Sequence, residues 1–252
     1  MRHISRRKLI TTGLTAAAGA SGLAAAVRIA NRYGLIPPDY GGVFGAGETL
    51  TYASHRLLTR HSMAREFPRS QISKSPVVNG RPPQSLTFTL LEAGKFADWQ
   101  LEVDGMVANP GSFSLDDLRG FPARSQITHL ACEEGWSFIA EWIGVPLSHV
   151  LNLAGTLPEA RYVVYFSMQS HWWDSVDMAD ALHPQTLLTY GMNGGDLPVG
   201  HGGPLRLRVP RQLGYKSVKY ITRLIVTDSL KDFGKGLGSS APEAGYAWYA
   251  GI

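Results

Sequence analysis

Residues 129–137 read His-Leu-Ala-Cys-Glu-Glu-Gly-Trp-Ser and contain Cys132, the single cysteine of the 252-residue chain. Residues 126–131 have the composition of a strand, so Cys132 is expected where a strand ends and a loop begins. A scaffold often presents functional groups at such a junction, and a thiolate is a good ligand for a soft metal. One cysteine cannot form an intramolecular disulfide or a multi-cysteine zinc or iron–sulfur site. Taken alone, a solitary cysteine more often indicates a small buried apolar residue.

Two downstream segments are rich in glycine and basic residues. Residues 201–206 read His-Gly-Gly-Pro-Leu-Arg, and residues 214–219 read Gly-Tyr-Lys-Ser-Val-Lys. Arg206 can form bidentate, charge-assisted bonds to a phosphate, and Lys216 supplies a second positive charge. Gly214 lets the backbone approach closely, and its amide can join an anion-binding nest. Taken alone, the first segment also fits a turn before a strand, with its arginine in a surface ion pair.

In their order along the chain, these segments resemble the oxidoreductase molybdopterin-binding domain shared by sulfite oxidases and the catalytic subunit of periplasmic protein-methionine-sulfoxide reductases. The resemblance extends from about Trp99 to Asp228, and residues 142–147 (Trp-Ile-Gly-Val-Pro-Leu) are similar to the family's Trp-x-Gly-x-Pro-Leu element. It implies a Mo-molybdopterin cofactor, with Cys132 as metal ligand and catalytic residue. It also assigns a set of further cofactor-binding positions, which are Arg65, Glu66, Ser167, His201, Arg206, Gly214, Tyr215 and Lys216.

The fold class follows from short strands and short helices that lack regular βαβ alternation, which is typical of an α+β domain. The resemblance implies the sulfite-oxidase-type molybdopterin-binding fold, with mixed β-sheets and short helices in a single domain. A short helix is expected around residues 48–61. We predict four regions: a twin-arginine signal or anchor (1–32), an irregular wrapping segment (33–85), the molybdopterin-binding domain (86–230) and a C-terminal tail packed on the domain (231–252).

The N-terminal region has the layout of an export signal. Arg6 and Arg7 precede a modestly apolar, glycine-interrupted run that ends near Val27. The pattern resembles a twin-arginine signal, which implies export of an already folded protein to the periplasm or another extracytoplasmic site. An ordinary secretory signal and an anchor helix are the alternatives, and an uncleaved segment could hold the protein at a membrane.

The basic surplus of the chain is confined to this region. The formal net charge is +4, but residues 1–32 contain six Lys and Arg residues and no acidic residue. The rest of the chain therefore holds 18 basic and 20 acidic residues. A nucleic-acid-binding protein would keep its positive charge in the folded part, so this distribution argues against that class.

Two local features bear on the substrate. Residues 171–174 read His-Trp-Trp-Asp and lie where the family builds its substrate funnel, so His171 is a candidate catalytic proton donor; a packed loop explains the same residues equally well. Glu133 and Glu134 follow the cysteine and would repel a dianion such as sulfite if they faced the metal. This argues against sulfite oxidation. Residues 132–137 also resemble the Cys-x-Glu-x-Trp-Ser pattern of methionine-sulfoxide reductase catalytic subunits, which implies reduction of an S-oxide or an N-oxide by oxo-transfer.

Three other functions remain open. Sulfite-type oxidation with a cytochrome acceptor is the alternative reaction, and a non-catalytic pterin-binding protein is the alternative outside enzymes. A hydrolase that uses Cys132 or Ser137 would lack a nucleophile-elbow sequence around either residue. Only about 24 residues follow Asp228, so we expect no counterpart of the dimerisation domain of eukaryotic sulfite oxidases. We expect a monomer that exchanges electrons with a separate haem, cytochrome or membrane partner.

Overall fold

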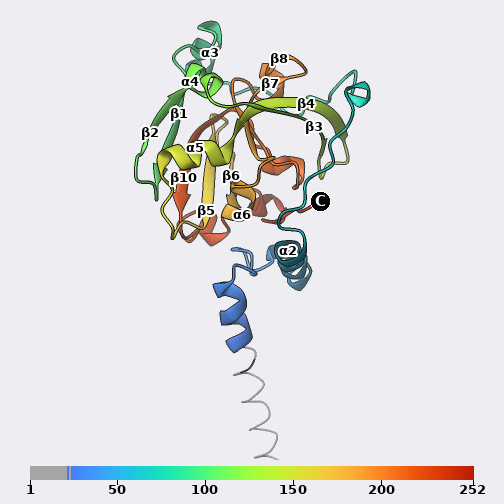
Figure 1. Ribbon diagram of the computed structural model, residues 1–252, viewed down its shortest axis with the longest axis vertical. Coiled ribbons are helices and arrows are strands. Elements are labelled where there is room, and N and C mark those ends of the chain that lie inside the picture. Colours follow the sequence, from blue (N-terminus) through green and yellow to red (C-terminus); the bar gives the residue numbers. More distant parts are fainter. Residues whose placement is uncertain (1–21, 23) are drawn as a thin grey trace, which may run out of the picture.

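The computed structural model describes residues 22 and 24–252, and two five-stranded sheets form its body (Figure 1). The first sheet has the strand order β2-β1-β10-β5-β6, with bounds Gly111–Ser114, Gln100–Gly105, Ile221–Thr227, Tyr162–Ser167 and Trp173–Asp177. Its β1–β10 pair is parallel and its other pairs are antiparallel. The late strand β10 therefore lies in the middle of the sheet, whose edge strands are β2 and β6.

The second sheet is antiparallel and carries the cysteine hairpin. It has the order β3-β4-β7-β8, and β9 also pairs with β7. The bounds are Arg124–Ala131, Ser137–Pro146, Leu187–Met192, Gly195–Asp196 and, for β9, Arg206–Arg208. At Gly144, any side chain would collide with the carbonyl of Leu188, so only glycine allows β4 and β7 to approach this closely.

Burial explains why these segments form strands. In β1, Leu101 and Val103 are buried while the residues between them face outward, as in a strand with one covered face. In β5, residues 162–165 are all buried, because this strand lies inside its sheet with both faces covered. The main core packs the apolar face of this sheet against α5 and the neighbouring strands of the second sheet.

Four short helices flank the sheets. Their bounds are Leu86–Ala93 (α3), Leu115–Gly120 (α4), Leu147–Ala154 (α5) and Met178–Ala181 (α6). In α4, Ser114 and Asp117 form a reciprocal capping box that satisfies the first free amides of the helix. The α+β class with mixed sheets and short helices is thereby confirmed.

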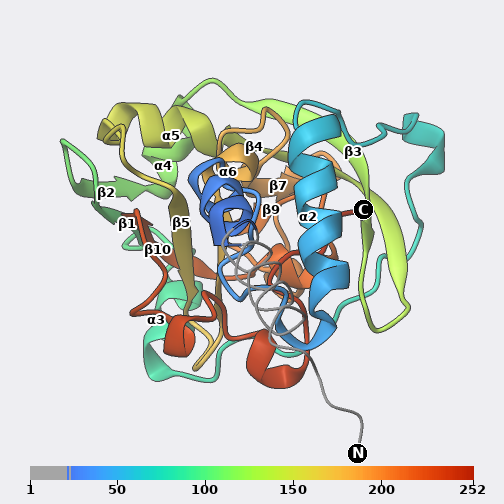
Figure 2. The same cartoon turned by 90° about the horizontal axis from the view of Figure 1, so that it is seen from below.

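The segment before the sheets crosses the underside of the molecule. The helix expected at 48–61 is present as α2 (Ala46–Leu58), which Figure 2 shows below the sheets and near the C-terminus. Its Arg56 is buried and pairs with Asp177 and Asp180, each at 2.7 Å. The C-terminal tail joins the same region, because Trp248 Nε1 donates to Ser175 Oγ at 2.8 Å.

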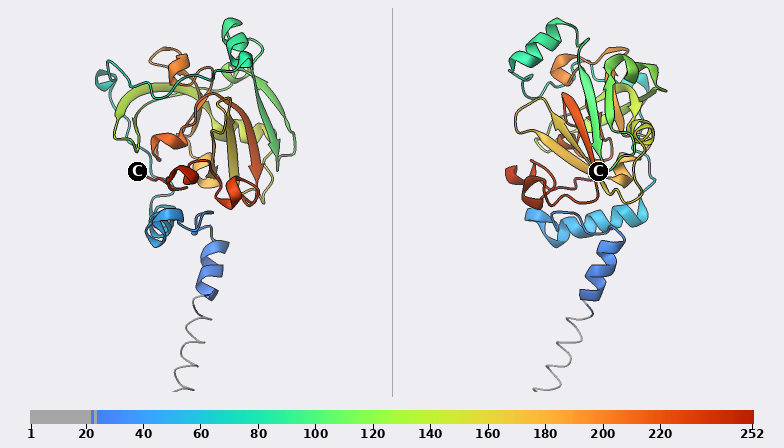
Figure 3. Two further views of the ribbon diagram at one scale, coloured as in Figure 1. Left: turned by 180° about the vertical axis from the view of Figure 1, so that it is seen from behind. Right: turned by 90° about the vertical axis from the view of Figure 1, so that its left-hand side faces the viewer.

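Residues 24–32 are helical and project away from the sheets (Figure 3). The predicted twin-arginine motif at Arg6 and Arg7 lies outside the described residues. Within the part that is described, no helix is both long and apolar enough to cross a membrane.

Candidate cofactor pocket and active site

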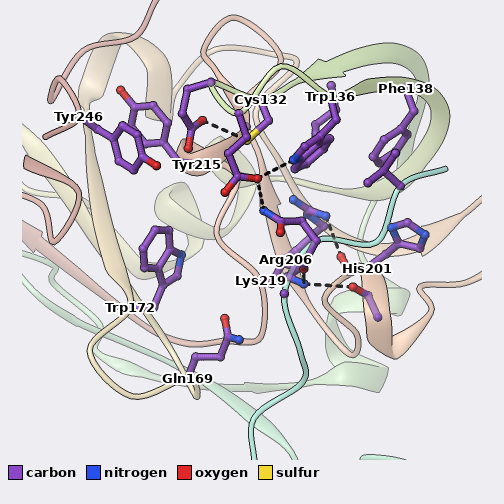
Figure 4. A pocket seen from close by; sticks show the side chains of 18 of the residues that line it. Cys132, Trp136, Phe138, Gln169, Trp172, His201, Arg206, Tyr215, Lys219 and Tyr246 are labelled. Carbon is purple, nitrogen blue, oxygen red and sulfur yellow. Dashed lines mark hydrogen bonds between the residues drawn. The ribbon is translucent and has the colours of Figure 1, made fainter. Parts of the chain in front are cut away.

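A pocket of about 370 Å³ opens beside Cys132, between the β3–β4 hairpin, the segment around β9 and the C-terminal tail (Figure 4). This volume lies within the range of small-molecule and cofactor sites, about 300–1,000 Å³. The side chains labelled in Figure 4 are those on which the chemistry depends: Cys132, Trp136, Phe138, Gln169, Trp172, His201, Arg206, Tyr215, Lys219 and Tyr246.

Cys132 is positioned by the turn that joins β3 to β4. Its amide donates to the carbonyl of Trp136 at 3.0 Å, and its carbonyl accepts from the amide of Gly135 at 3.1 Å. Gly135 has a φ of +91°, a conformation that favours glycine. The strand-end position predicted from the sequence is confirmed, because β3 ends at Ala131.

The thiol is partly buried and faces an acidic neighbour. Sγ of Cys132 donates to Oε2 of Glu133 at 3.1 Å. Burial, and then the nearby carboxyl, raises the pKa of the Cys132 thiol to about 12. A metal that binds this sulfur as thiolate must therefore displace a tightly held proton, as a strongly binding soft metal does.

The floor of the pocket carries positive charge that no carboxylate neutralises. Arg206 Nη1 and Nη2 donate to the carbonyls of His201 and Ser217, both at 2.7 Å, but its Nε is buried without a partner. In the described part of the chain, no acidic side chain forms an ion pair with Arg206, Arg208 or Lys219. Burial lowers the pKa of Arg206 and Lys219, which line the pocket, to about 10 and about 8, and that of Arg208, which does not line it, to about 9. A bound anion would remove this electrostatic cost.

The local structure explains how the cations are held there. The guanidinium groups of Arg206 and Arg208 lie 5.2 and 5.4 Å from the ring centroid of the buried Trp142, where the ring face stabilises positive charge. Lys219 Nζ donates to the carbonyls of Asn79 and Gly200, at 2.6 and 3.1 Å. These ring contacts and hydrogen bonds hold both arginines and the lysine in place, and none of them neutralises a positive charge.

Gly214 brings the next segment against the cysteine. A Cβ at this position would lie 3.2 Å from the carbonyl of Ala131 and 3.6 Å from Cα of Cys132. A larger residue would force the Ala131 carbonyl to shift slightly, so glycine favours this close approach, which places Tyr215 in the pocket wall.

Aromatic and acidic side chains form the mouth. Tyr215 and Tyr246 stack with centroids 5.2 Å apart, and Trp172 lines the same pocket. Glu134 Oε2 accepts from Trp136 Nε1 at 2.6 Å and from Asn79 Nδ2 at 3.0 Å. The pocket thus has a cationic floor and a mouth that is aromatic and acidic.

Five of the predicted site residues meet in this pocket, namely Cys132, His201, Arg206, Gly214 and Tyr215. His201 has its pKa lowered to about 4 by burial and the neighbouring cations, so it is neutral there at pH 7. Ser167 does not line the pocket, but its Oγ donates to the carbonyl of Lys219 at 2.7 Å and accepts from the amide of Gln169. It therefore positions two residues that do.

The other four predicted residues lie outside the pocket wall. Lys216 is completely buried, and its Nζ binds Asp174 at 2.6 Å because the turn over 214–216 directs it into the core. His171 is exposed in a turn with a φ of +61°. Arg65 lies over the ring of Phe67, 4.8 Å from its centroid. The last of the four, Glu66, pairs with Arg124 at 3.0 Å. Their direct roles stay predictions.

Several pocket residues were not predicted. Lys219 lies in the basic segment 214–219, three residues beyond Lys216. The charge that marked Lys216 as a candidate for phosphate binding marks Lys219 equally. Asn79 and Tyr246 come from the wrapping segment and the tail, where no motif marks them. Their recruitment depends on tertiary contacts alone.

The residues present fit a molybdenum pterin. Its phosphate matches the unneutralised cations, and its metal accepts a thiolate. No cluster of three or more His, Cys, Asp or Glu side chains that could hold a metal exists among the described residues. The metal would therefore need ligands from an organic carrier besides Cys132. The fold and pocket together define the class of molybdenum–pterin oxidoreductases.

Comparison with known proteins places the chain within that class. The family model of the oxidoreductase molybdopterin binding domain matches residues 90–232, and the chain belongs to this family. Membership implies a molybdenum–pterin cofactor, and it confirms the resemblance seen in the sequence.

Individual relatives share this domain. A putative protein-methionine-sulfoxide reductase subunit YedZ1 of Azospira oryzae is 42% identical over 155 residues, which cover 62% of this chain and 56% of that protein. The protein-methionine-sulfoxide reductase catalytic subunit MsrP of Xanthomonas campestris pv. campestris is 35% identical over 153 residues, covering 55% and 48%. The chain thus spans about half the length of these relatives. The crystal structure of the sulfane dehydrogenase SoxCD from Paracoccus pantotrophus is similar with a TM-score of 0.50 and 27% identity, covering 54% of this chain and 40% of that one.

Proposed function

We propose that the protein is an exported Mo-molybdopterin oxidoreductase that reduces an S-oxide, with methionine sulfoxide in a polypeptide as its substrate. The reaction consumes two electrons and two protons and converts the S-oxide into a thioether and water. The observation that carries the proposal is the meeting of Cys132 with the unneutralised cations Arg206 and Lys219 in one pocket. The names of the relatives at 42% and 35% identity support the choice of substrate.

The pocket residues would have separate roles in cofactor binding, metal binding, proton transfer and substrate contact. When bound, the molybdenum–pterin group supplies two-electron oxygen-atom transfer. Arg206 and Lys219 would bind the phosphate, and Cys132 would bind the metal. The Glu133 carboxylate lies 3.1 Å from Sγ, where it can pass a proton to the reacting centre. Trp172 and Tyr246 offer ring faces and edges to the sulfur of the substrate.

The acidic mouth distinguishes this reaction from sulfite oxidation. Glu133 and Glu134 both line the pocket, so a dianion would meet negative charge before it reached the metal. A neutral S-oxide meets no such barrier. An N-oxide is equally neutral and is therefore the substrate to compare.

The surrounding organisation is part of the same proposal. Residues 1–32 would serve as a twin-arginine signal or anchor, residues 33–85 would wrap the domain at 86–230, and residues 231–252 would form its packed tail. The protein would be an extracytoplasmic monomer. Electrons would come from a separate haem, cytochrome or membrane partner, since two relatives are themselves named as subunits.

The test is metal content combined with turnover. Protein matured in a molybdopterin-producing host should contain close to one molybdenum per chain and should oxidise a reduced viologen dye with methionine sulfoxide. Cys132→Ser should abolish turnover, whereas Ser137→Ala should not, because Ser137 has no place in the pocket. Turnover by Cys132→Ser, or faster oxidation of sulfite than reduction of any S-oxide, would contradict the proposal.

A further inference from the structure

A second cavity shares a wall with the cofactor pocket. It has a volume of about 470 Å³ and lies between α2 and the C-terminal tail. Glu133, Tyr215 and Tyr246 line both spaces. Figure 4 shows these two tyrosines together on one side of Cys132. We call this second cavity the α2–tail groove.

Both walls of the groove are fixed. On the α2 side, Glu48 Oε1 accepts from the amide of Tyr249 at 2.8 Å, and His55 Nδ1 lies 2.9 Å from the Tyr249 hydroxyl. On the tail side, Tyr215 donates its hydroxyl to the carbonyl of Ala247 at 2.7 Å. The groove is therefore a built feature of the fold, and Tyr215 is the partition between it and the cofactor pocket.

The lining selects for apolar ligands. Aromatic and aliphatic side chains and backbone form most of it, with Phe44 and Thr51 on the α2 side and Leu213 beneath the tail. The side chain of Phe44 is 60% exposed, so a ligand in the groove could cover its ring. Glu48 is the ionisable group of the α2 wall, and burial raises its pKa to about 7, which favours the neutral form. Among the residues that the structure describes, no lysine or arginine lines the groove, so none of them would pair with an anionic ligand there.

We infer that the α2–tail groove is a specificity subsite that binds an apolar side chain flanking the oxidised methionine of a polypeptide substrate. This rests on the proposed function. The occupant follows from the wall that the groove shares with the cofactor pocket. A polypeptide whose S-oxide enters the cofactor pocket past Tyr246 crosses that wall, so its neighbouring residues reach the groove. Successive side chains of an extended peptide point to opposite sides, so a residue near the methionine can turn into the groove. Peptide recognition of this kind takes its specificity from pockets for individual side chains.

The experiment compares two five-residue peptides that carry a central methionine sulfoxide, one with leucine and one with serine at the flanking positions. The holoenzyme is assayed with reduced viologen, and each kcat/KM is divided by that of free methionine sulfoxide for the same enzyme variant. Binding of the fluorescently labelled peptides to resting holoenzyme is measured in parallel. We expect a leucine preference of about 10-fold in both measurements.

Two groove variants and one matched control locate that preference. Thr51→Arg and Phe44→Ala should reduce it to less than about 2-fold, one by blocking the groove and the other by removing its apolar wall. Leu50→Arg should retain the preference, since Leu50 is also on α2 and is 68% exposed but does not line the groove.

The outcomes separate the subsite from the reaction. A leucine preference that survives both groove variants, or no preference in either measurement, overturns the subsite even if free methionine sulfoxide is reduced. If nothing is reduced, the proposed function fails. Peptide binding then still decides the subsite, because it needs no turnover.

Discussion

Replacing Lys216 and Lys219 separately by methionine should separate stability of the fold from retention of the cofactor. The two residues are three positions apart, yet their ammonium groups have opposite surroundings. Lys216 is fully buried and donates to Asp174 at 2.6 Å and to the carbonyl of Ser175 at 3.1 Å. Lys219 lines the cofactor pocket and has no acidic partner among the described residues.

The magnitudes follow from these partners. Lys216→Met leaves the Asp174 carboxyl buried without its cation, which should lower the free energy of unfolding by about 3–5 kcal/mol. Burial already raises the pKa of Asp174, so protonation can offset part of this loss. Lys219→Met removes an unneutralised charge at the expense of two bonds to carbonyls, a net change of about 1 kcal/mol or less. Loss of its charge-assisted bond to a phosphate should weaken cofactor binding about 10- to 100-fold.

The assay has two parts. Urea unfolding is measured on protein from a host that cannot make the cofactor, so that ligand binding does not contribute to stability. Molybdenum per chain is measured after gel filtration of protein from a competent host. Asp174→Asn combined with Lys216→Met should recover part of the lost stability, because it removes the stranded charge. Full cofactor retention by Lys219→Met, or cofactor loss by Lys216→Met at unchanged stability, would refute the reasoning.

Three further changes test other parts of the structure. Arg56→Met should lower the free energy of unfolding by about 3–5 kcal/mol in urea titrations, since it leaves the buried Asp177 without its cation and leaves Asp180 only the longer pair with Arg211, at 3.6 Å; a change below about 1 kcal/mol would contradict the docking of α2. Burial raises the pKa of Glu48 from 4.5 to about 7, so its stabilising contribution is complete below pH 4.5 and is lost as the pH rises through 7. Glu48→Gln should therefore be more stable than wild type above pH 7, by up to about 3 kcal/mol, and identical stability–pH curves would exclude this. Trp172→Ala should raise KM for methionine sulfoxide about 10-fold with little change in kcat, if Trp172 contributes binding energy alone; an unchanged KM would remove it from the substrate path.

The sequence predicted those parts of the site that are locally encoded. Cys132 stands at a strand end because residues 126–131 form a strand, and Arg206 faces the pocket because a short strand, β9, fixes its direction. Lys216 was assigned to the cofactor because its charge is visible in the sequence. Its burial against Asp174 is not, since the two residues are 42 positions apart. The turn over 214–216 directs Lys216 into the core, whereas Lys219, three residues later, reaches the pocket.

Strand β4 illustrates the same limit for the fold. Its residues are buried on both faces over much of 137–146, so no clean alternation marks it as a strand. The shift in register at Gly144 depends on contact with β7, far along the chain. The helix at 46–58 was predictable from its local pattern, whereas its docking through Arg56 was not.

The pocket is assembled from two kinds of segment, and this division constrains how its function can vary. The thiol and the cations lie within residues 90–232, the part that matches the family model. Asn79 and Tyr246, together with Phe44 and Thr51 of the α2–tail groove, lie outside that part. Residues that hold the cofactor must satisfy one fixed chemical group, but those at the rim need only match a substrate. Relatives that share the domain can therefore keep one cofactor chemistry and differ in substrate through the segments that precede and follow it.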